Sequence, residues 1–163
     1  MNRILNTKKA VKFSKKFKRE GKKIVLAGGV FDILHIGHIK FLEAAKKKGD
    51  ILFILLENDE NVKKYKGPQR PINTQEERAR VLASLRFVDY VVNLPVMRTN
   101  DDYDNLITAI KPDIIATTKK DPQVIHNIRQ AKIIGAEVCL VVNRISNRST
   151  TRIADILTKE NNL

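Results

Sequence analysis

The sequence predicts an α/β fold: a Rossmann-like, doubly wound, five-stranded parallel sheet with helices on both faces. After residue 22, short apolar runs of strand length alternate with segments of helical periodicity. This alternation is typical of a parallel sheet, because parallel strands need a crossover connection, which is usually a helix. The runs are almost continuously apolar, as in strands that are covered on both faces.

The first half of the expected sheet begins at residues 23–31, "KIVLAGGVF". A helix is expected over 35–49, where apolar residues recur every three positions until Gly49 ends the pattern. The second strand is expected over 50–58, "DILFILLEN". Residues 59–73 are expected to be a polar loop, because glycine and prolines interrupt them.

A capping-box pattern opens the second half. Thr74 is followed three residues later by Glu77, which predicts the start of a helix with the sequence "TQEERARVLASL". The remaining elements follow by the same alternation. The further strands are expected over 89–95, 113–118 and 136–142, and the further helices within 101–110 and over 122–134 and 149–159.

The positive charge is concentrated at the start of the chain. Of the formal net charge of +13, residues 1–23 carry +9, with ten Lys or Arg and one acid. We therefore divide the chain into a basic N-terminal helical segment, 1–22, and a domain, 23–163. Val11, Phe13 and Phe17 could give the segment a narrow apolar side, so we expect a solvated helix docked on the domain. An anionic membrane or a nucleic acid is the alternative partner for it.

Other compositional features exclude some classes of protein. No apolar run approaches the roughly 20 residues that a membrane-spanning helix needs, and no secretory signal is recognised. Cys139 is the single cysteine, so no intrachain disulfide can form. These features favour a cytoplasmic protein.

Two histidines stand where a ligand site is expected. Ligands of such folds bind beyond the carboxyl ends of the strands. There, Gly28 and Gly29 allow close approach to the backbone, and His35 and His38 flank Gly37 at the start of the next helix. A helix N-terminus favours anions, and residues three apart share one face. No third ligand lies nearby at metal-binding spacing, so we predict a phosphate site and no protein-held metal.

Two motifs carry a family resemblance. "GGVFDILHIGH" resembles the HxGH signature of the nucleotidylyltransferase superfamily, and "ISNRSTTRI" resembles its second signature. Their order and separation are similar to those of small members such as glycerol-3-phosphate cytidylyltransferases and heptose-phosphate adenylyltransferase domains. The intervening "KKYKGPQRPINTQEERARVLASLRFVDYVV" is more similar to the latter.

The resemblance implies roles for individual residues. The implied catalytic residues are His35, His38, Lys66 and Arg144. The implied nucleotide-binding residues are Val30, Phe31, His35, Gly37, His38, Lys66, Arg78, Arg86, Arg144, Ser149, Thr150 and Thr151, and those implied at the acceptor are Asp32 and Lys64. Mg²⁺ is expected to accompany the nucleoside triphosphate, and a homodimer is expected from the resemblance.

The chemistry of the expected reaction agrees with these residue types. An acceptor phosphate attacks the α-phosphorus of ATP or CTP and releases pyrophosphate. A phosphate monoester has its second pKa at about 6, so it needs no general base at neutral pH. It needs positive donors that offset repulsion between two polyanions, and His, Lys and Arg supply them.

We therefore expect a nucleotidylyltransferase that transfers AMP from ATP to a phosphorylated small molecule such as heptose 1-phosphate. Glycerol-3-phosphate cytidylyltransferase and FMN adenylyltransferase are alternatives of the same class. A non-catalytic, basic nucleic-acid-binding protein is the alternative of another class.

Overall fold

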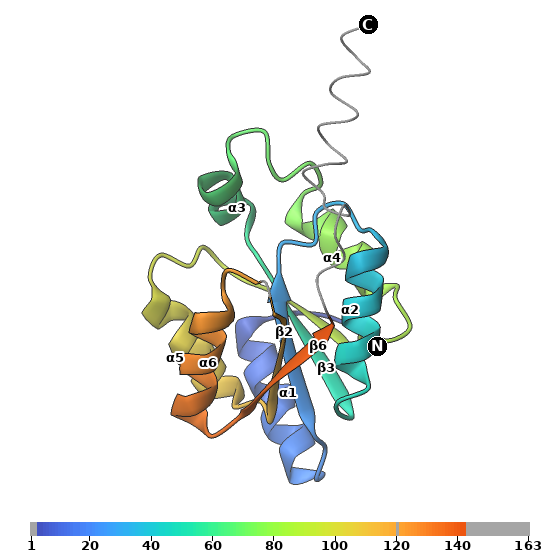
Figure 1. The fold of residues 1–163 in the computed structure, drawn as a ribbon, viewed down its shortest axis with the longest axis vertical. Coiled ribbons are helices and arrows are strands. Elements are labelled where there is room, and N and C mark those ends of the chain that lie inside the picture. The colour runs from blue at the N-terminus through green and yellow to red at the C-terminus, as the bar shows by residue number, and fades with distance from the viewer. Residues whose placement is uncertain (1–2, 120, 143–163) are drawn as a thin grey trace, which may run out of the picture.

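The computed structural model describes residues 3–119 and 121–142, which form a six-stranded parallel sheet with helices packed on both faces (Figure 1). The α/β class predicted from the sequence is confirmed. The strands are β1 (Ile4–Asn6), β2 (Ile24–Gly29), β3 (Ile51–Leu56), β4 (Tyr90–Asn93), β5 (Ile114–Thr118) and β6 (Glu137–Val142). The helices are α1 (Thr7–Arg19), α2 (Ile36–Lys46), α3 (Asp59–Lys66), α4 (Gln75–Ala83), α5 (Asn100–Ile110) and α6 (Val124–Ile134). The helix expected over 149–159 lies outside the described residues.

The structure corrects the predicted number of strands. The sheet has six strands, because β1 lies inside the basic lead-in and pairs in parallel with β4, with Leu5 opposite Val92. Three residues carry too little pattern to predict a strand, and the tertiary pairing with β4 makes them one. The helix expected in the lead-in is α1. The domain boundary after residue 22 stays a prediction.

The direction in which successive strands are added to the sheet reverses beside β2. The order is β1-β4-β3-β2-β5-β6, so the chain builds the sheet on one side of β2 through β3 and β4, then returns to β5 on the other side. In open α/β sheets, ligands bind outside the carboxyl ends of the strands at such a switch point. The loop that follows β2 is therefore placed where a ligand is expected.

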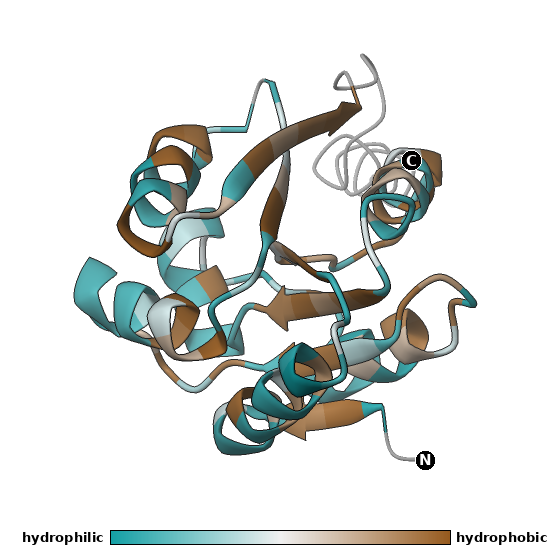
Figure 2. Ribbon diagram, turned by 90° about the horizontal axis from the view of Figure 1, so that it is seen from below, coloured by the Kyte–Doolittle hydropathy of each residue, from teal (hydrophilic) through white to brown (hydrophobic). Residues whose placement is uncertain are grey.

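Two apolar clusters cover the two faces of the sheet. Ile24 and Leu26 of β2 join the cluster under α1, α5 and α6, whereas Val25 and Ala27 join the cluster under α2 and α4. This is the period of two expected for a strand that is buried on both sides. Hydropathy colouring shows strands that are mostly hydrophobic and helices with one hydrophobic and one hydrophilic side (Figure 2). Among the described residues, none of the helices has the length and apolar character of a membrane span.

The polar loop expected over residues 59–73 is also corrected, because its first half is helix α3. Asn58 caps this helix by accepting a hydrogen bond from the Glu60 N–H at 2.9 Å. Acidic residues occupy its first turn and lysines its last, which suits the helix dipole. Only Asn61 and Val62 of α3 are buried, so the sequence has no apolar period that would reveal the helix.

Three aspartates accept backbone hydrogen bonds at the amino edge of the sheet. Each directly precedes a strand and accepts a backbone N–H from the neighbouring strand. The pairs are Asp50 with Lys23 (2.8 Å), Asp89 with Leu52 (2.7 Å) and Asp113 with Ile24 (2.7 Å). These side chains satisfy N–H groups at the ends of the strands, where the ladder no longer supplies a partner.

Replacing Asp113 should lower the free energy of unfolding. In Asp113→Ala, the Ile24 N–H loses its acceptor, and we expect a cost of about 1–3 kcal/mol. Asp113→Asn keeps an acceptor and loses only the ion pair with Lys18 (3.0 Å), so it should cost less. Urea unfolding measures both, and equal midpoints for Asp113→Ala and the unchanged protein would contradict the role of this cap.

Candidate active site

The loop after β2, at the carboxyl edge of the sheet, contains a residue with an unusual backbone conformation. Phe31 is buried and has a φ of 48°, a left-handed conformation that is costly for an aromatic residue. A Cβ at Gly29 would come within 2.8 Å of the Phe31 ring, so the ring folds over a position where only glycine fits. Such strain collects at ligand-binding segments, where the surrounding structure enforces it.

The two predicted histidines lie together at the start of α2. His35 is the N-cap, and its Nδ1 accepts a hydrogen bond from the Gly37 N–H at 3.1 Å. The Nδ1 atom of His38 accepts from the His35 N–H at 3.4 Å. The rings are stacked, with centroids 3.9 Å apart and 25° between their planes. The shared face predicted from the i, i+3 spacing is therefore present.

These contacts fix the tautomer of both rings. A ring nitrogen that accepts a hydrogen bond carries no proton, so each neutral imidazole carries its proton on Nε2. Because backbone N–H groups at the start of α2 donate to both Nδ1 atoms, the two imidazoles present a pair of Nε2–H donors. The positive dipole end of the helix favours an anion at the same place.

The surroundings of His38 keep its ring neutral. Burial lowers the pKa of His38 from its ordinary 6.5 to about 4, and positive charge on His35 and Lys66 opposes protonation further. The edge of the Phe31 ring also packs against His38, with centroids 5.3 Å apart. At neutral pH, His38 can therefore donate a hydrogen bond to an anion without carrying a charge.

Gly37 has a steric reason to be glycine. A Cβ at this position would lie 2.9 Å from Cε1 and Nδ1 of His35. Any side chain there would displace the ring that caps the helix. The glycine between the histidines is therefore part of what holds the imidazole pair in place.

Asp32, predicted to lie at the acceptor, makes its hydrogen bonds within the protein. Its side chain is fully buried, and its carboxylate accepts hydrogen bonds from Arg70 Nε (2.8 Å) and from the N–H groups of Ile72 (2.9 Å) and Asn73 (2.9 Å). Burial would raise the pKa of this carboxyl, but these donors outweigh burial and hold the pKa below its ordinary value. Asp32 anchors the loop after α3, and its role at the acceptor stays a prediction.

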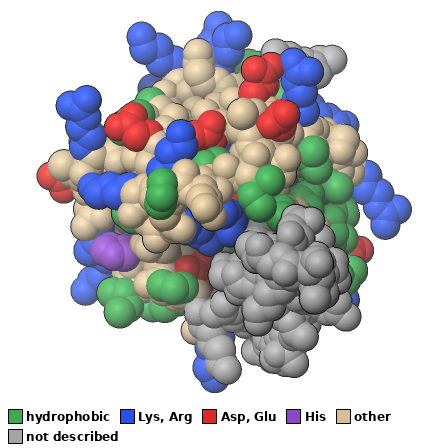
Figure 3. Space-filling model, turned by 90° about the horizontal axis from the view of Figure 1, so that it is seen from above, with side chains coloured by type: hydrophobic (Ala, Val, Ile, Leu, Met, Phe, Trp, Pro, Cys, Tyr) green, Lys and Arg blue, Asp and Glu red, His purple; other side chains and the backbone are tan. Residues whose placement is uncertain are grey.

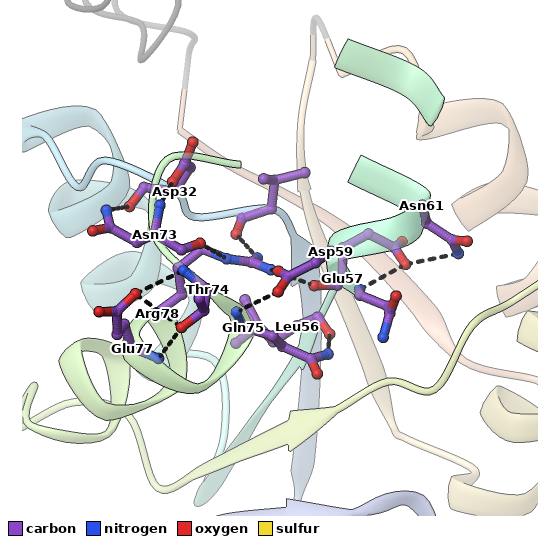
Figure 4. A network of polar contacts seen from close by, with 12 residues as sticks. Asp32, Leu56, Glu57, Asp59, Asn61, Asn73, Thr74, Gln75, Glu77 and Arg78 are labelled. Carbon is purple, nitrogen blue, oxygen red and sulfur yellow. Dashed lines mark hydrogen bonds and ion pairs between the residues drawn. The ribbon is translucent and has the colours of Figure 1, made fainter. Parts of the chain in front are cut away.

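Arg78, predicted to bind the nucleotide, is also committed to the protein. Its side chain has no exposed surface. It donates to the carbonyl oxygens of Val30 (2.5 Å), Glu57 (2.8 Å) and Asn73 (3.1 Å) and pairs with Asp59 (2.6 Å) (Figure 4). One guanidinium thus joins the loop after β2, the end of β3 and the start of α4. Arg78 therefore holds the segments that form the site in place, and its contact with a nucleotide stays a prediction.

The predicted lysines of the site lie on α3. Lys64 and Lys66 are exposed, and their spacing of two residues directs them to different sides of the helix. Lys66 is the one whose charge acts on His38. Seen from above, where the strands end, Lys and Arg side chains stand around the outline of the molecule (Figure 3).

A buried polar cluster holds α3 in position. Asn61 is 3% exposed and donates from Nδ2 to the Met97 carbonyl (2.9 Å) and the Glu57 carboxylate (3.1 Å). The Tyr103 hydroxyl donates to the other Glu57 oxygen at 2.8 Å. Burial and this hydrogen bond raise the pKa of Tyr103, so the hydroxyl keeps the proton that it donates.

Arg86 lies in the segment that leads from α4 to β4, and its predicted contact with the nucleotide stays a prediction. It lies between the C-cap of α4, Ser84, and the first residue of β4, Tyr90. In a parallel sheet, all strands start at the edge opposite their carboxyl ends, so α4 carries the chain away from the imidazole pair. Four further predicted residues, Arg144, Ser149, Thr150 and Thr151, lie outside the described residues.

Sequence reasoning missed residues that hold the site together. They are Arg70, Asn73, Gln75 and Asp59. Gln75 donates from Nε2 to the carbonyls of Leu56 (3.1 Å) and Leu94 (2.9 Å), so it joins the ends of β3 and β4. The signal for Arg70 was its position in "GPQRPIN", a charged residue within a rigid, proline-rich turn.

Known proteins resemble this chain over most of its length. A family model described as Cytidylyltransferase-like matches residues 26–159. The bifunctional protein HldE of Nitratiruptor sp. is 37% identical over 145 residues, which are 87% of this chain and 29% of that protein. The bifunctional protein HldE of Aliarcobacter butzleri is 49% identical over 104 residues, 64% of this chain and 21% of that protein. The chain thus spans less than a third of the length of these curated relatives.

Solved structures agree on the fold. The lipopolysaccharide core biosynthesis protein from Thermoplasma volcanium superposes with a TM-score of 0.59 at 30% identity, covering 79% of this chain and 100% of that chain. Pantoate-beta-alanine ligase from Francisella tularensis superposes with a TM-score of 0.65 at 19% identity, covering 98% of this chain and 78% of that chain. The second likeness shows the fold alone.

The neutral state of His38 can be measured directly. Long-range ¹H–¹⁵N spectra should show the Nε2–H tautomer of His38 until the pH approaches 4. The unfolded chain takes up this proton near the ordinary pKa of 6.5, so the free energy of unfolding should fall as the pH is lowered from 6.5 towards 4. His38→Asn should remove this part of the pH dependence. A His38 ring that titrates near 6.5 would contradict the burial argument.

Proposed function

Because the chain belongs to the cytidylyltransferase-like family, we propose that it is a nucleotidylyltransferase that transfers AMP from ATP to a phosphorylated small molecule such as heptose 1-phosphate. The observation that carries the proposal is the stacked imidazole pair at the N-terminus of α2, with both Nδ1 atoms accepting backbone N–H groups. The preference for ATP and a heptose phosphate rests on the sequence motifs and on the relatives named HldE.

The reaction needs donors to phosphate oxygens and no general base. The acceptor phosphate is largely a dianion at neutral pH, because its second pKa is about 6. One of its oxygens attacks the α-phosphorus, the bond from that phosphorus to the bridging oxygen breaks, and pyrophosphate leaves. The Nε2–H groups of His35 and His38 and the N-terminus of α2 would stabilise the negative charge that grows on the phosphates. Lys66 would add a positive charge, and Lys64 would meet the acceptor.

Magnesium fits this site as part of the substrate. Asp32, the carboxylate of the loop after β2, has its oxygens engaged by Arg70 and by two backbone N–H groups and offers no ligand. Mg²⁺ commonly keeps several waters and binds through substrate phosphates. We therefore expect the ion to arrive with the triphosphate, where it would neutralise part of the phosphate charge.

Substitutions at the two histidines separate donor chemistry from helix capping. His38→Asn keeps an acceptor near the position of Nδ1 but lacks the Nε2–H donor, so kcat should fall about 10²-fold or more. His38→Gln places an amide N–H farther out and should retain more activity. His35→Asn should leave the fold as stable, because asparagine is a preferred N-cap, while kcat also falls. An unchanged kcat in His38→Asn would exclude the role.

A substrate screen identifies the nucleotide and the acceptor. Release of pyrophosphate is measured for ATP and CTP, each combined with heptose 1-phosphate, glycerol 3-phosphate and FMN. We expect ATP with heptose 1-phosphate to give the highest kcat/KM. Turnover of CTP with glycerol 3-phosphate, or of ATP with FMN, would replace this assignment by one of the two alternatives in the class. No turnover with any pair would contradict the proposed substrates.

A further inference from the structure

Helix α1 packs its apolar side against the core. Ala10 and Ser14 are fully buried, and Phe13 and Phe17 pack against the aromatic residues of the sheet. The ring centroids of Phe13 and Tyr90 are 5.5 Å apart, and those of Phe17 and Phe53 are 6.3 Å apart. The apolar side of α1 is therefore not available for insertion into a membrane, and the helix cannot be removed without exposing the core.

The outer side of α1 is a dense row of cations. Its exposed residues are Lys8, Lys9, Lys12, Lys15, Lys16 and Arg19, which we call the basic face. Positions 8, 12, 15 and 19 follow the helical repeat and form one stripe about 16 Å long. Glu20 is the only acid within residues 1–23, and it lies 3.8 Å from Lys16.

The helix dipole explains only part of the basic face, because Lys16 and Arg19 lie in the last turn of α1 but Lys8 and Lys9 lie in the first. Cations are favourable in the last turn of a helix and unfavourable in the first, because of the helix dipole. Helices α3, α4 and α5 follow this rule and begin with acidic residues. Like α2 and α6, α1 has no acid in its first turn, but among the described helices it alone places lysines there, Lys8 and Lys9. These two lysines oppose the dipole, so the dipole does not account for them.

We propose that the basic face of α1 binds the surface of an anionic phospholipid bilayer. A flat anionic surface can meet the whole stripe at once, and lysines near such a surface contribute additively. Single-stranded nucleic acids are commonly bound by stacking on aromatic side chains, and every exposed residue of α1 is Lys or Arg. With the apolar side buried, attachment is purely electrostatic and reversible.

The arrangement of neighbouring groups is compatible with this docking. Helix α5 lies beside α1 (Figure 1). There, Asp104 pairs with Arg129, which partly neutralises its charge, and Asp102 accepts the N–H groups of Arg98 and Thr99. The imidazole pair belongs to α2, which covers the opposite face of the sheet. Docking through α1 would leave that site accessible, and the proposal does not depend on the proposed function.

The test compares two variants of equal charge. The first is Lys8→Gln, Lys12→Gln, Lys15→Gln and Arg19→Gln combined, which removes the stripe. The control is Lys40→Gln, Lys47→Gln, Lys48→Gln and Arg80→Gln combined, which removes four exposed cations from the α2 and α4 side. Circular dichroism and the thermal midpoint verify that both variants fold. Binding is measured by co-sedimentation with vesicles of phosphatidylglycerol and phosphatidylcholine, with pure phosphatidylcholine vesicles, and with a 20-base-pair DNA duplex.

We expect the unchanged protein to bind the anionic vesicles at low salt, to ignore the neutral ones, and to dissociate at high ionic strength. Removing the stripe should weaken binding about fivefold per charge, roughly several hundredfold in all, while the control binds nearly as the unchanged protein does. Equal losses in both variants would show a general charge effect and overturn the proposal. Tighter binding to the duplex than to the vesicles would also overturn it, in favour of a nucleic acid.

Discussion

The site depends on the need of the N–H groups at the start of α2 for hydrogen-bond acceptors outside the helix ladder. Every helix begins with N–H groups that need acceptors. In this chain, asparagine or threonine caps α1, α3, α4 and α5, whereas His35 caps α2. Using an imidazole for this task fixes where its proton lies, because the capping nitrogen cannot carry it. The same contact that completes the helix therefore orients a donor towards the ligand side, and a second imidazole stacks on the first.

Buried charge gives this edge its rigidity. The Arg78 guanidinium and the Asp32 carboxylate are fully buried, and each is surrounded by protein partners. Burying an ion is costly unless its hydrogen-bonding capacity is used, and removing one partner would leave the other uncompensated. Because the partners of Arg78 belong to three segments, its hydrogen bonds can be complete only when those segments are correctly placed. The loops that present ligand-binding residues are thus held to one arrangement.

The alternation of elements, five of the six strands and the spacing of the imidazole pair can be predicted from the amino-acid sequence. These features are local. Apolar runs predict strands, and the i, i+3 spacing of His35 and His38 fixes their shared face once a helix forms. The capping box of Thr74 and Glu77 is likewise a property of four consecutive residues, and it begins α4 as expected.

The other features of the fold and the site depend on tertiary contacts. Strand β1 exists because β4 offers a partner, and α3 is held by Asn61 and Glu57 rather than by an apolar period. The contacts of Asp32 and Arg78 and the position of Arg86 depend on which groups lie across the fold and at which edge, information that residue type and spacing do not contain. In the sequence, a charged residue that faces a ligand cannot be distinguished from one that bridges two loops. The physical difference is burial, which only the packed fold sets.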